Sequence, residues 1–487
     1  MNSTFSSIAM YSTGLFLTKA TSLFMLPFLT HSLHVDEIGR LEFLASISAF
    51  AGLITGLAMY EALYRFVGES DDAIKRKSVA EEFYSIVWLS SLFFLPFILL
   101  VVNLVTHSFP EISVSEIALL VSGVVLSAPL SMTLVWLRIE DKVNHFVTIT
   151  IGGCVMQIVV ILLVLNMNMG VAGVLLAAVI SHLLQLCAFH LSSHFKLRLP
   201  NKTRTRQALK YSLPIAFSGL IAFGLNGAEK WLIALTSSLD SLAAYAISAK
   251  LALAMCILVQ PFNMWWMGKR FGGLKNQGDH YVVSITHVGI VWIFILATSL
   301  LFAGPLLISI ALPEPYSDAS LYLIFPLSCA VMKETSELVN IGLLYRQQSQ
   351  RLLYINIQSL CIGAILVVLL WNYSIWGILI ALLVAQSYKL YSVYTTSQSL
   401  YPLNYKLLPI IVMMSGYFSL AVLSTKVTAD FYRLAMATVA PLLVAVFACY
   451  SGLLPEPFSL NQLVLKVKEV KGRAMKQRKL KQRQLKL

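Results

Sequence analysis

The stretch HFKLRLPNKTRTRQALK, residues 194–210, determines how the rest of the chain is organised. It holds six Lys/Arg residues, one proline and no acidic residue, and long apolar segments lie on both sides of it. Basic connections between apolar segments are typical of the cytoplasmic side of a membrane. We therefore predict that residues 194–210 form a basic cytoplasmic hinge between two membrane-embedded parts of the chain.

The composition indicates an all-α polytopic membrane protein. Of the 487 residues, 58% are hydrophobic and 12% are charged, whereas a soluble protein carries roughly 25% charged residues. Apolar runs of about 20 residues, long enough to cross a hydrocarbon core of roughly 30 Å, recur along the chain. About fourteen transmembrane helices are predicted, at residues 8–29, 39–64, 83–105, 116–138, 146–166, 170–192, 210–235, 242–266, 282–304, 320–344, 352–371, 374–396, 407–425 and 431–452.

The distribution of Lys and Arg predicts the orientation of these helices. If the N-terminus is cytoplasmic, the outer connections hold only Arg40, Lys426 and Arg433, whereas most of the 36 Lys/Arg residues lie in inner connections. This is the positive-inside pattern, so we expect both termini to be cytoplasmic. The outer connections are all short and leave no outer domain for catalysis. No signal peptide is expected, because no basic start precedes a short apolar stretch and a small-residue cleavage site.

Matching features at nearly constant offsets indicate two copies of a six-helix unit. The matching pairs are Tyr11 and Tyr211, Thr30 and Thr236, and Gly173 and Gly377. Six is an even number, so both copies would have the same orientation, which is a known transporter plan. The predicted parts are an N-terminal repeat at 1–193, the hinge at 194–210, a C-terminal repeat at 211–400, two extra helices at 401–455, and a basic cytoplasmic tail at 456–487.

Ten ionisable residues lie inside predicted helices, where each is costly unless it is paired or lines water. They are Lys19, Glu61, Arg65, Glu229, Lys230, Lys250, Lys333, Glu334, Glu337 and Lys389. Lys19, Lys250 and Lys389 have no acid within one turn, so we interpret them as lining a polar cavity. The alternative is that each pairs with a distant acid such as Glu229 or Glu334.

Local ion pairs are an alternative for four of these residues. Glu61 and Arg65 are four residues apart, as are Lys333 and Glu337, so each pair can be neutralised along one helix face. Glu229 and Lys230 point about 100° apart and cannot both face one partner helix.

No metal or cofactor site is predicted. The six cysteines lie singly in apolar runs, and none has the spacing of a metal ligand. His190 and His194 are four residues apart, but no third ligand is apparent. The chain has no glycine-rich phosphate-binding loop, so direct use of ATP is not expected.

The C-terminal tail, residues 461–487, holds ten Lys/Arg residues and one acid. Apolar residues recur in it at helical spacing, so the tail is predicted to lie on the anionic inner leaflet as an amphipathic helix. The alternative is a solvated segment that only fixes the topology. Nucleic-acid binding is not expected, because the basic residues follow the membrane topology.

The stretch YSTGLFLTKATSLFMLPFLTHSLHVDEIGRLEF, residues 11–43, together with the two copies, the basic hinge and the short outer loops, resembles a known family. It is similar to the lipid-linked oligosaccharide flippases of bacterial polysaccharide export, including O-antigen flippases. These form the polysaccharide transporter branch of the multidrug/oligosaccharidyl-lipid/polysaccharide (MOP) exporter superfamily. The resemblance is one of architecture and covers about residues 1–400.

The resemblance implies a substrate and a place of action. The substrate would be an oligosaccharide repeat unit on a polyprenyl diphosphate, moved from the inner to the outer leaflet of the bacterial inner membrane for O-antigen, lipopolysaccharide or other surface polysaccharide synthesis. The expected partners are this substrate, the bilayer, and a glycan polymerase with its chain-length machinery. The expected substrate-binding residues are Lys19, Lys250, Lys333 and Lys389. The expected ion-coupling residues are Glu229 and Glu334.

Two other functions are considered. A drug or small-cation antiporter of the same superfamily is disfavoured, because several intramembrane lysines stand where a dominant acid cluster would be needed. A membrane glycan polymerase is disfavoured, because the chain has no outer domain and no paired carboxylates in a loop.

Overall fold

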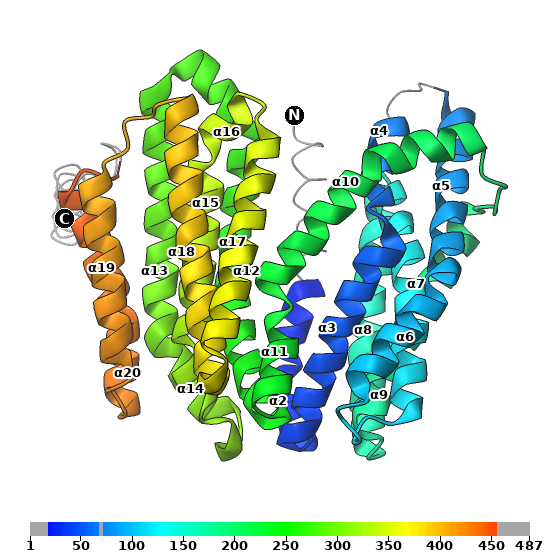
Figure 1. Cartoon of the computed structure of the whole chain (residues 1–487), viewed down its shortest axis with the longest axis horizontal. Helices are drawn as coiled ribbons and strands as arrows, with labels where there is room; N and C mark the ends of the chain where they lie inside the picture. The colour runs from blue at the N-terminus through cyan, green and yellow to red at the C-terminus, as the bar shows by residue number, and fades with distance from the viewer. Residues whose placement is uncertain (1–17, 68–71, 455–487) are drawn as a thin grey trace, which may run out of the picture. The chain divides into compact units, whose positions relative to one another are not determined.

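The structure is a computed structural model that describes residues 18–67 and 72–454, and every regular element in these ranges is helical (Figure 1). The α-helices are α2 (Leu26–Ser32), α3 (Val35–Gly56), α4 (Met59–Val67), α5 (Ala73–Phe93), α6 (Leu95–Thr106), α7 (Val114–Ile139), α8 (Val143–Asn166), α9 (Gly170–Ser193), α10 (Lys202–Asn226), α11 (Glu229–Thr236), α12 (Leu239–Gln277), α13 (Asp279–Ala311), α14 (Ala319–Tyr322), α15 (Ile324–Val339), α16 (Ile341–Tyr345), α17 (Ser349–Leu369), α18 (Ser374–Leu400), α19 (Leu407–Ser424) and α20 (Asp430–Tyr450). Two short 3₁₀ helices are η1 (Glu314–Tyr316) and η2 (Trp371–Tyr373). The predicted all-α membrane architecture is confirmed.

Eleven described helices are long and apolar enough to cross a membrane, or twelve if α5 and α6 form one span with a bend of 41°. Two predicted spans are not among them. The span predicted at 8–29 begins outside the described residues. The predicted C-terminal tail lies wholly outside them. The span predicted at 320–344 is divided into α14, α15 and α16, of which α15 is the longest at 16 residues. The count of fourteen therefore stays a prediction.

Several predicted helices are interrupted, and the interruptions have local causes. One predicted span is divided into α3 and α4 where Leu57 and Ala58 adopt left-handed backbone angles, with φ of 48° and 49°. Another is divided into α10 and α11 at Gly227. The bend between α5 and α6 lies just before Pro96, which has no N–H to continue the helix. In contrast, α12 runs on to Gln277, eleven residues beyond its predicted end, so part of a predicted inner loop is helical.

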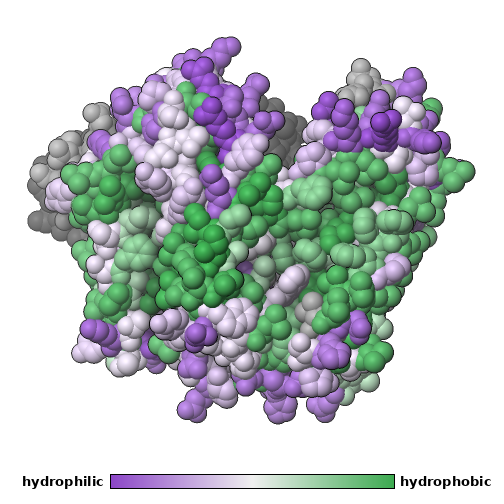
Figure 2. Space-filling view, in the orientation of Figure 1, coloured by the Kyte–Doolittle hydropathy of each residue, from purple (hydrophilic) through white to green (hydrophobic). Residues whose placement is uncertain are grey.

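The chain divides into two compact units. The first comprises the chain up to Ile257 together with Leu307–Pro326 and Leu353–Tyr388. The second comprises Leu258–Leu306, Leu327–Leu352 and the chain from Lys389. In the first unit, Figure 2 shows a hydrophobic surface over the middle of the helices and hydrophilic residues near their ends. Large apolar side chains of this unit, such as Phe93, Leu104 and Leu163, are exposed, as expected of helices that face lipid.

The predicted hinge is bound to α5. Glu81, whose side chain is 3% exposed, accepts hydrogen bonds from Arg198 Nε at 2.6 Å and from the Lys196 N–H at 3.1 Å. Arg204 forms an ion pair with Glu82 at 2.7 Å. Asn201 caps α10 by accepting a hydrogen bond from the Arg204 N–H, so α10 begins within the predicted hinge, at Lys202. The stretch is therefore an ordered strap on the first unit.

Within the first unit, α3 and α12 meet at the helix ends that the Lys/Arg bias predicts to be outer. A Cβ atom added to Gly39 would lie 1.9 Å from the carbonyl oxygen of Leu239. Only a residue without a side chain can occupy this position, because backbone at this distance cannot give way like a flexible side chain. Gly39, in the stretch VDEIGR, thus permits close packing between the two predicted repeats.

Gly39→Ala is expected to destabilise the protein, because the added methyl group must push α3 and α12 apart. Overpacking of this kind costs about 1–3 kcal/mol. The measurement is the thermal unfolding midpoint of the purified full chain in detergent. Gly152→Ala in α8 is the matched control, since no atom lies within 4 Å of its added Cβ. Equal midpoints for the two variants would contradict the proposed contact.

A chain cut after Pro200 is expected to reassemble when residues 1–200 and 201–487 are co-expressed. The reason is that Arg204 on the second fragment remains bound to Glu82 of α5 on the first fragment. Co-purification through a tag on one fragment measures this. Cutting in the Glu82→Gln background should lower the recovery of the complex severalfold, whereas Glu81→Gln, which removes a contact within the first fragment, serves as the control. Recovery that does not depend on Glu82 would show that the Arg204 contact does not hold the fragments together.

Candidate functional site

The main charged cluster lies inside the first unit and is centred on Glu42 of α3. Lys230 Nζ of α11 contacts Glu42 Oε2 at 2.7 Å, and Lys250 Nζ of α12 contacts Glu42 Oε1. The side chains of Glu42, Lys230 and Lys250 are 8%, 22% and 17% exposed. One carboxylate is therefore shared by two ammonium groups, and it connects helices of the two predicted repeats.

Local sequence places each of these groups at depth in the membrane. A capping box formed by His34 and Glu37 begins α3, and Glu42 lies seven residues later, about 10 Å along the helix axis. Lys250 lies eleven residues into α12, about 16 Å from its start. After the break at Gly227, α11 begins at Glu229, so Lys230 is its second residue. Charges at such depths are stable only when they are paired or hydrated.

Glu229, next to Lys230, faces a different helix, as the separation of about 100° between neighbours requires. It is 6% exposed, and Tyr245 OH of α12 donates a hydrogen bond to its Oε1 at 3.3 Å. Its Oε2 is buried and has no hydrogen-bond partner in the described part of the chain. Trp231 Nε1 donates to Ser46 Oγ of α3 at 2.7 Å. The first turn of α11 thus carries three polar groups that reach α3 and α12.

A clamp at the N-terminal ends of α3 and α7 orients the residues before Glu42. Arg40 lies 3.5 Å from both Glu37 and Glu116, and it donates a hydrogen bond to the Glu111 carbonyl oxygen at 2.6 Å. Tyr316 of η1 packs at the same end, where its hydroxyl donates to the Leu33 carbonyl oxygen at 3.5 Å. Burial, together with nearby carboxylates, raises the pKa of Tyr316 to about 12, so this hydroxyl keeps its proton at neutral pH.

The second unit holds a separate set of polar residues on α12 and α15. Asn263 Nδ2 donates to Glu334 Oε2 at 2.8 Å, and Glu334 is 8% exposed. Arg270, which is 4% exposed, donates from Nη1 to Asn340 Oδ1 at 3.0 Å. Asn340 in turn donates to Glu337 Oε2 at 3.0 Å. Two separate groups of hydrogen bonds therefore connect α12 with α15 and with Asn340, the residue that follows α15.

The remaining predicted site residues are distributed over both units. Lys389 of α18 is 9% exposed and belongs to the second unit, where Glu337 and Lys333 are the charges that act on it. In the first unit, Lys19 is exposed. Arg65 is also exposed, and its guanidinium group lies over the Tyr211 ring at 4.6 Å. The predicted pairing of Lys333 with Glu337, and of Glu61 with Arg65, stays a prediction.

Sequence reasoning missed Glu42, although a signal was available. Glu42 lies within the predicted span 39–64 and within the motif stretch, yet it was not among the ten intramembrane ionisable residues. The alternative that Lys250 pairs with a distant acid describes the structure, but the acid is Glu42 and neither Glu229 nor Glu334. Asn263, Asn340 and the buried Arg270 were also missed as parts of a site.

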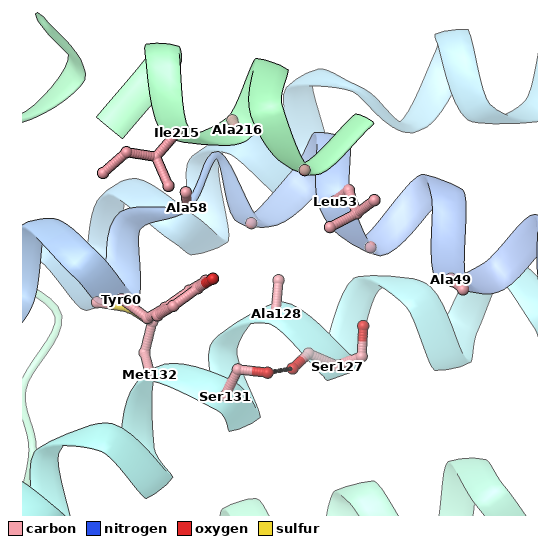
Figure 3. A pocket seen from close by; sticks show the side chains of 13 residues that line it. Ala49, Leu53, Ala58, Tyr60, Ser127, Ala128, Ser131, Met132, Ile215 and Ala216 are labelled. Atoms are coloured by element: carbon pink, nitrogen blue, oxygen red, sulfur yellow. Dashed lines mark hydrogen bonds between the residues drawn. The ribbon is translucent and has the colours of Figure 1, made fainter. Parts of the chain in front are cut away.

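A cavity of about 230 Å³ lies beside the break between α3 and α4 (Figure 3). Small residues of α3, α7 and α10 line it, including Gly52, Ser127 and Gly219, and Tyr60 forms one side. Its volume is below the roughly 300–1,000 Å³ of pockets for drug-sized ligands. The cavity is therefore too small for an oligosaccharide. It is unfilled space between the α3–α4 break and α10.

Glu42→Gln is expected to lower the free energy of unfolding by up to about 3 kcal/mol, because it leaves two half-buried ammonium groups without their counter-charge. The double variant Glu42→Gln/Lys250→Gln should recover part of this loss, since one uncompensated charge is removed. Thermal unfolding of the purified chain measures both effects. Glu314→Gln, an exposed residue at the same end, is the control. Strictly additive losses for the two substitutions would rule out the pairing.

Comparison with known proteins agrees with this architecture. Residues 33–263 match the model of a family described as "Polysaccharide biosynthesis protein". No curated protein sequence matches the chain. Among solved structures, the chain is similar to one described as "Lipid II flippase MurJ, inward closed conformation", with a TM-score of 0.71 and 11% identity over 90% of this chain and 98% of that chain.

A second similar structure is an "Inward-facing conformation of a multidrug resistance MATE family transporter of the MOP superfamily". Its TM-score is 0.57, with 13% identity over 82% of this chain and 96% of that chain. An outward-facing MATE transporter of the same superfamily gives a TM-score of 0.53 and 13% identity over 84% and 96%. The predicted resemblance is thus confirmed: the chain has the fold of the MOP transporters, and its residues 33–263 match the polysaccharide biosynthesis family.

Proposed function

We propose that the chain is a flippase that moves polyprenyl-diphosphate-linked oligosaccharide repeat units from the inner to the outer leaflet of a bacterial inner membrane. The product would be used for O-antigen or another surface polysaccharide. The observation that carries the proposal is the Glu42 cluster, in which buried lysines join the two predicted repeats. The family match at residues 33–263 supports a polysaccharide substrate, and the fold supports transport by alternating access.

The chemistry of the substrate explains why such a protein is needed. Each unpaired hydroxyl that enters hydrocarbon costs several kcal/mol, so a sugar headgroup does not cross a bilayer unaided. The diphosphate is anionic and attracts ammonium groups. The proposed substrate-binding residues remain Lys19, Lys250, Lys333 and Lys389, and Lys230 joins them because it shares Glu42 with Lys250.

The cluster suggests how binding could open the outer side. An arriving diphosphate would compete with the Glu42 carboxylate for Lys230 and Lys250, which weakens the contact of α3 with α11 and α12. The exchange would cost little free energy, because the diphosphate replaces the carboxylate as the anion beside the same two ammonium groups. Opening would thus depend on an anionic substrate, and a neutral lipid would leave the contact intact.

The ion-coupling residues in this proposal are Glu229 and Glu334. Glu229 has one carboxylate oxygen without a partner in the described residues, so a proton or a small cation could be bound there. A membrane potential supplies roughly 2.3 kcal/mol per charge per 100 mV, enough to bias the populations of two conformations. Glu334 likewise accepts a hydrogen bond on one oxygen, from Asn263.

Lys250→Gln and Lys19→Gln are each expected to lower the amount of surface glycan at least about tenfold, a loss of about 1.4 kcal/mol in binding. The test uses a strain whose surface glycan has a known structure and whose own flippase is deleted. Each variant is expressed in it at the same protein level as the wild-type chain. Lys426→Gln, an exposed lysine of an outer connection, removes the same charge and should have no effect.

The outcomes separate the candidate functions. Unchanged glycan in both Lys250→Gln and Lys19→Gln would refute the binding role of these lysines. Drug resistance without glycan rescue would identify a drug or cation antiporter. Repeat units that reach the outer leaflet but stay unlinked in the strain without the chain would identify a polymerase.

A further inference from the structure

A second, larger cavity of about 400 Å³ lies at the end of the first unit that carries the strap. It is enclosed by the first turns of α5, the α7–α8 turn and residues 193–198. The side chains that line it include Lys77, Lys142, Lys196, Trp136 and His194. The Lys/Arg bias predicts that this end is cytoplasmic. None of these residues belongs to the Glu42 cluster or to the proposed transport site.

The charge in this cavity is unbalanced in favour of cations. Its two acids are already paired, Glu81 with Arg198 at 2.6 Å and Glu140 with Arg76 at 3.1 Å. Three lysines remain. In the part of the chain that the structure describes, no carboxylate lies within 4 Å of their ammonium groups.

The contacts of the three lysines support this reading. Lys77 Nζ donates to the carbonyl oxygen of Ser193 at 2.9 Å, which fixes its position without neutralising its charge. Lys142 and Lys196 are exposed. The cavity thus presents three ammonium groups with no counter-ion of their own, and an anionic ligand would supply it.

Exposed aliphatic side chains lie on the same elements as the lysines of the cavity, which favours a lipid over a soluble anion. Ile74 lines the cavity and is 80% exposed. Leu197 and Leu199 flank Arg198 in the strap and are 70% and 96% exposed. Large aliphatic side chains with this exposure next to lysines are unfavourable in water but favourable at the boundary between headgroups and acyl chains. A soluble anion would leave them uncovered.

We propose that this cavity binds the phosphate group of an anionic phospholipid in the leaflet on the strap side. The phosphodiester would be held by Lys142 and Lys196, with Lys77 behind them, and the acyl chains would lie against Ile74, Leu197 and Leu199. Basic pockets between membrane helices on the cytoplasmic side are known to bind such headgroups. The bound lipid would connect α5, the α7–α8 turn and the strap. This inference does not depend on the proposed transport activity.

The test measures lipid binding to the purified full chain in a neutral detergent. Phosphatidylglycerol, phosphatidylcholine and inorganic phosphate are titrated separately, and binding is followed by the thermal unfolding midpoint and by native mass spectrometry. The variant is Lys142→Gln/Lys196→Gln, because both side chains are exposed and the Lys77 contact is kept. The matched control is Lys202→Gln/Lys210→Gln, which removes two exposed lysines from α10 at the same end of the molecule.

Phosphatidylglycerol should stabilise the wild-type chain. Its affinity should fall about 30-fold in the Lys142/Lys196 variant, because each lost lysine lowers the affinity roughly fivefold and the two factors multiply. The Lys202/Lys210 control should keep its affinity within about twofold, well below the effect of roughly fivefold for one lysine. Equal affinity in the wild type and the Lys142/Lys196 variant would overturn the proposal, as would equal losses in both variants. Equal binding of phosphatidylcholine would refute charge recognition, and full competition by inorganic phosphate would refute a lipid ligand. If the double variant does not fold, Lys142→Gln alone should show a loss of about fivefold.

Discussion

The shared carboxylate of Glu42 is the constraint on which the first unit depends. Two ammonium groups in an apolar environment repel each other and strongly favour water, so Lys230 and Lys250 can lie at this depth only with an anion between them. The other features of this end follow from that need. Gly39 lets α3 approach α12, the Arg40 clamp fixes the start of α3, and the break at Gly227 turns Lys230 toward Glu42.

The two units use polar residues in different ways. In the first unit, full charges are paired directly across helices of the two predicted repeats. In the second unit, amide side chains are placed between the charges: Asn263 contacts Glu334, and Asn340 lies between Arg270 and Glu337. Amide bridges satisfy buried hydrogen-bonding groups at lower cost than the direct burial of opposite charges. The two units therefore place their polar residues in different chemical arrangements.

Much of the fold could be predicted from the sequence, because membrane topology depends on local quantities. The length of each apolar run and the placement of Lys and Arg predict spans and connections without knowledge of tertiary contacts. The breaks at Leu57 and Gly227 were not predicted, since neither involves proline. The site was harder to predict because its pairs are not local. Glu42 and Lys230 are separated by 188 residues, whereas spacing rules identify partners only within one or two helical turns.

The strap has a consequence for how the first repeat can exist alone. Glu81 is almost completely buried, and its charge is compensated by residues 196 and 198, which follow the last helix of that repeat. A chain that ended at Ser193 would contain the described helices of that repeat but would lack both groups that bind Glu81. During synthesis, the first repeat is therefore complete only when the strap has also emerged from the ribosome. The ion pairs of the strap with α5 extend as far as Arg204, which contacts Glu82.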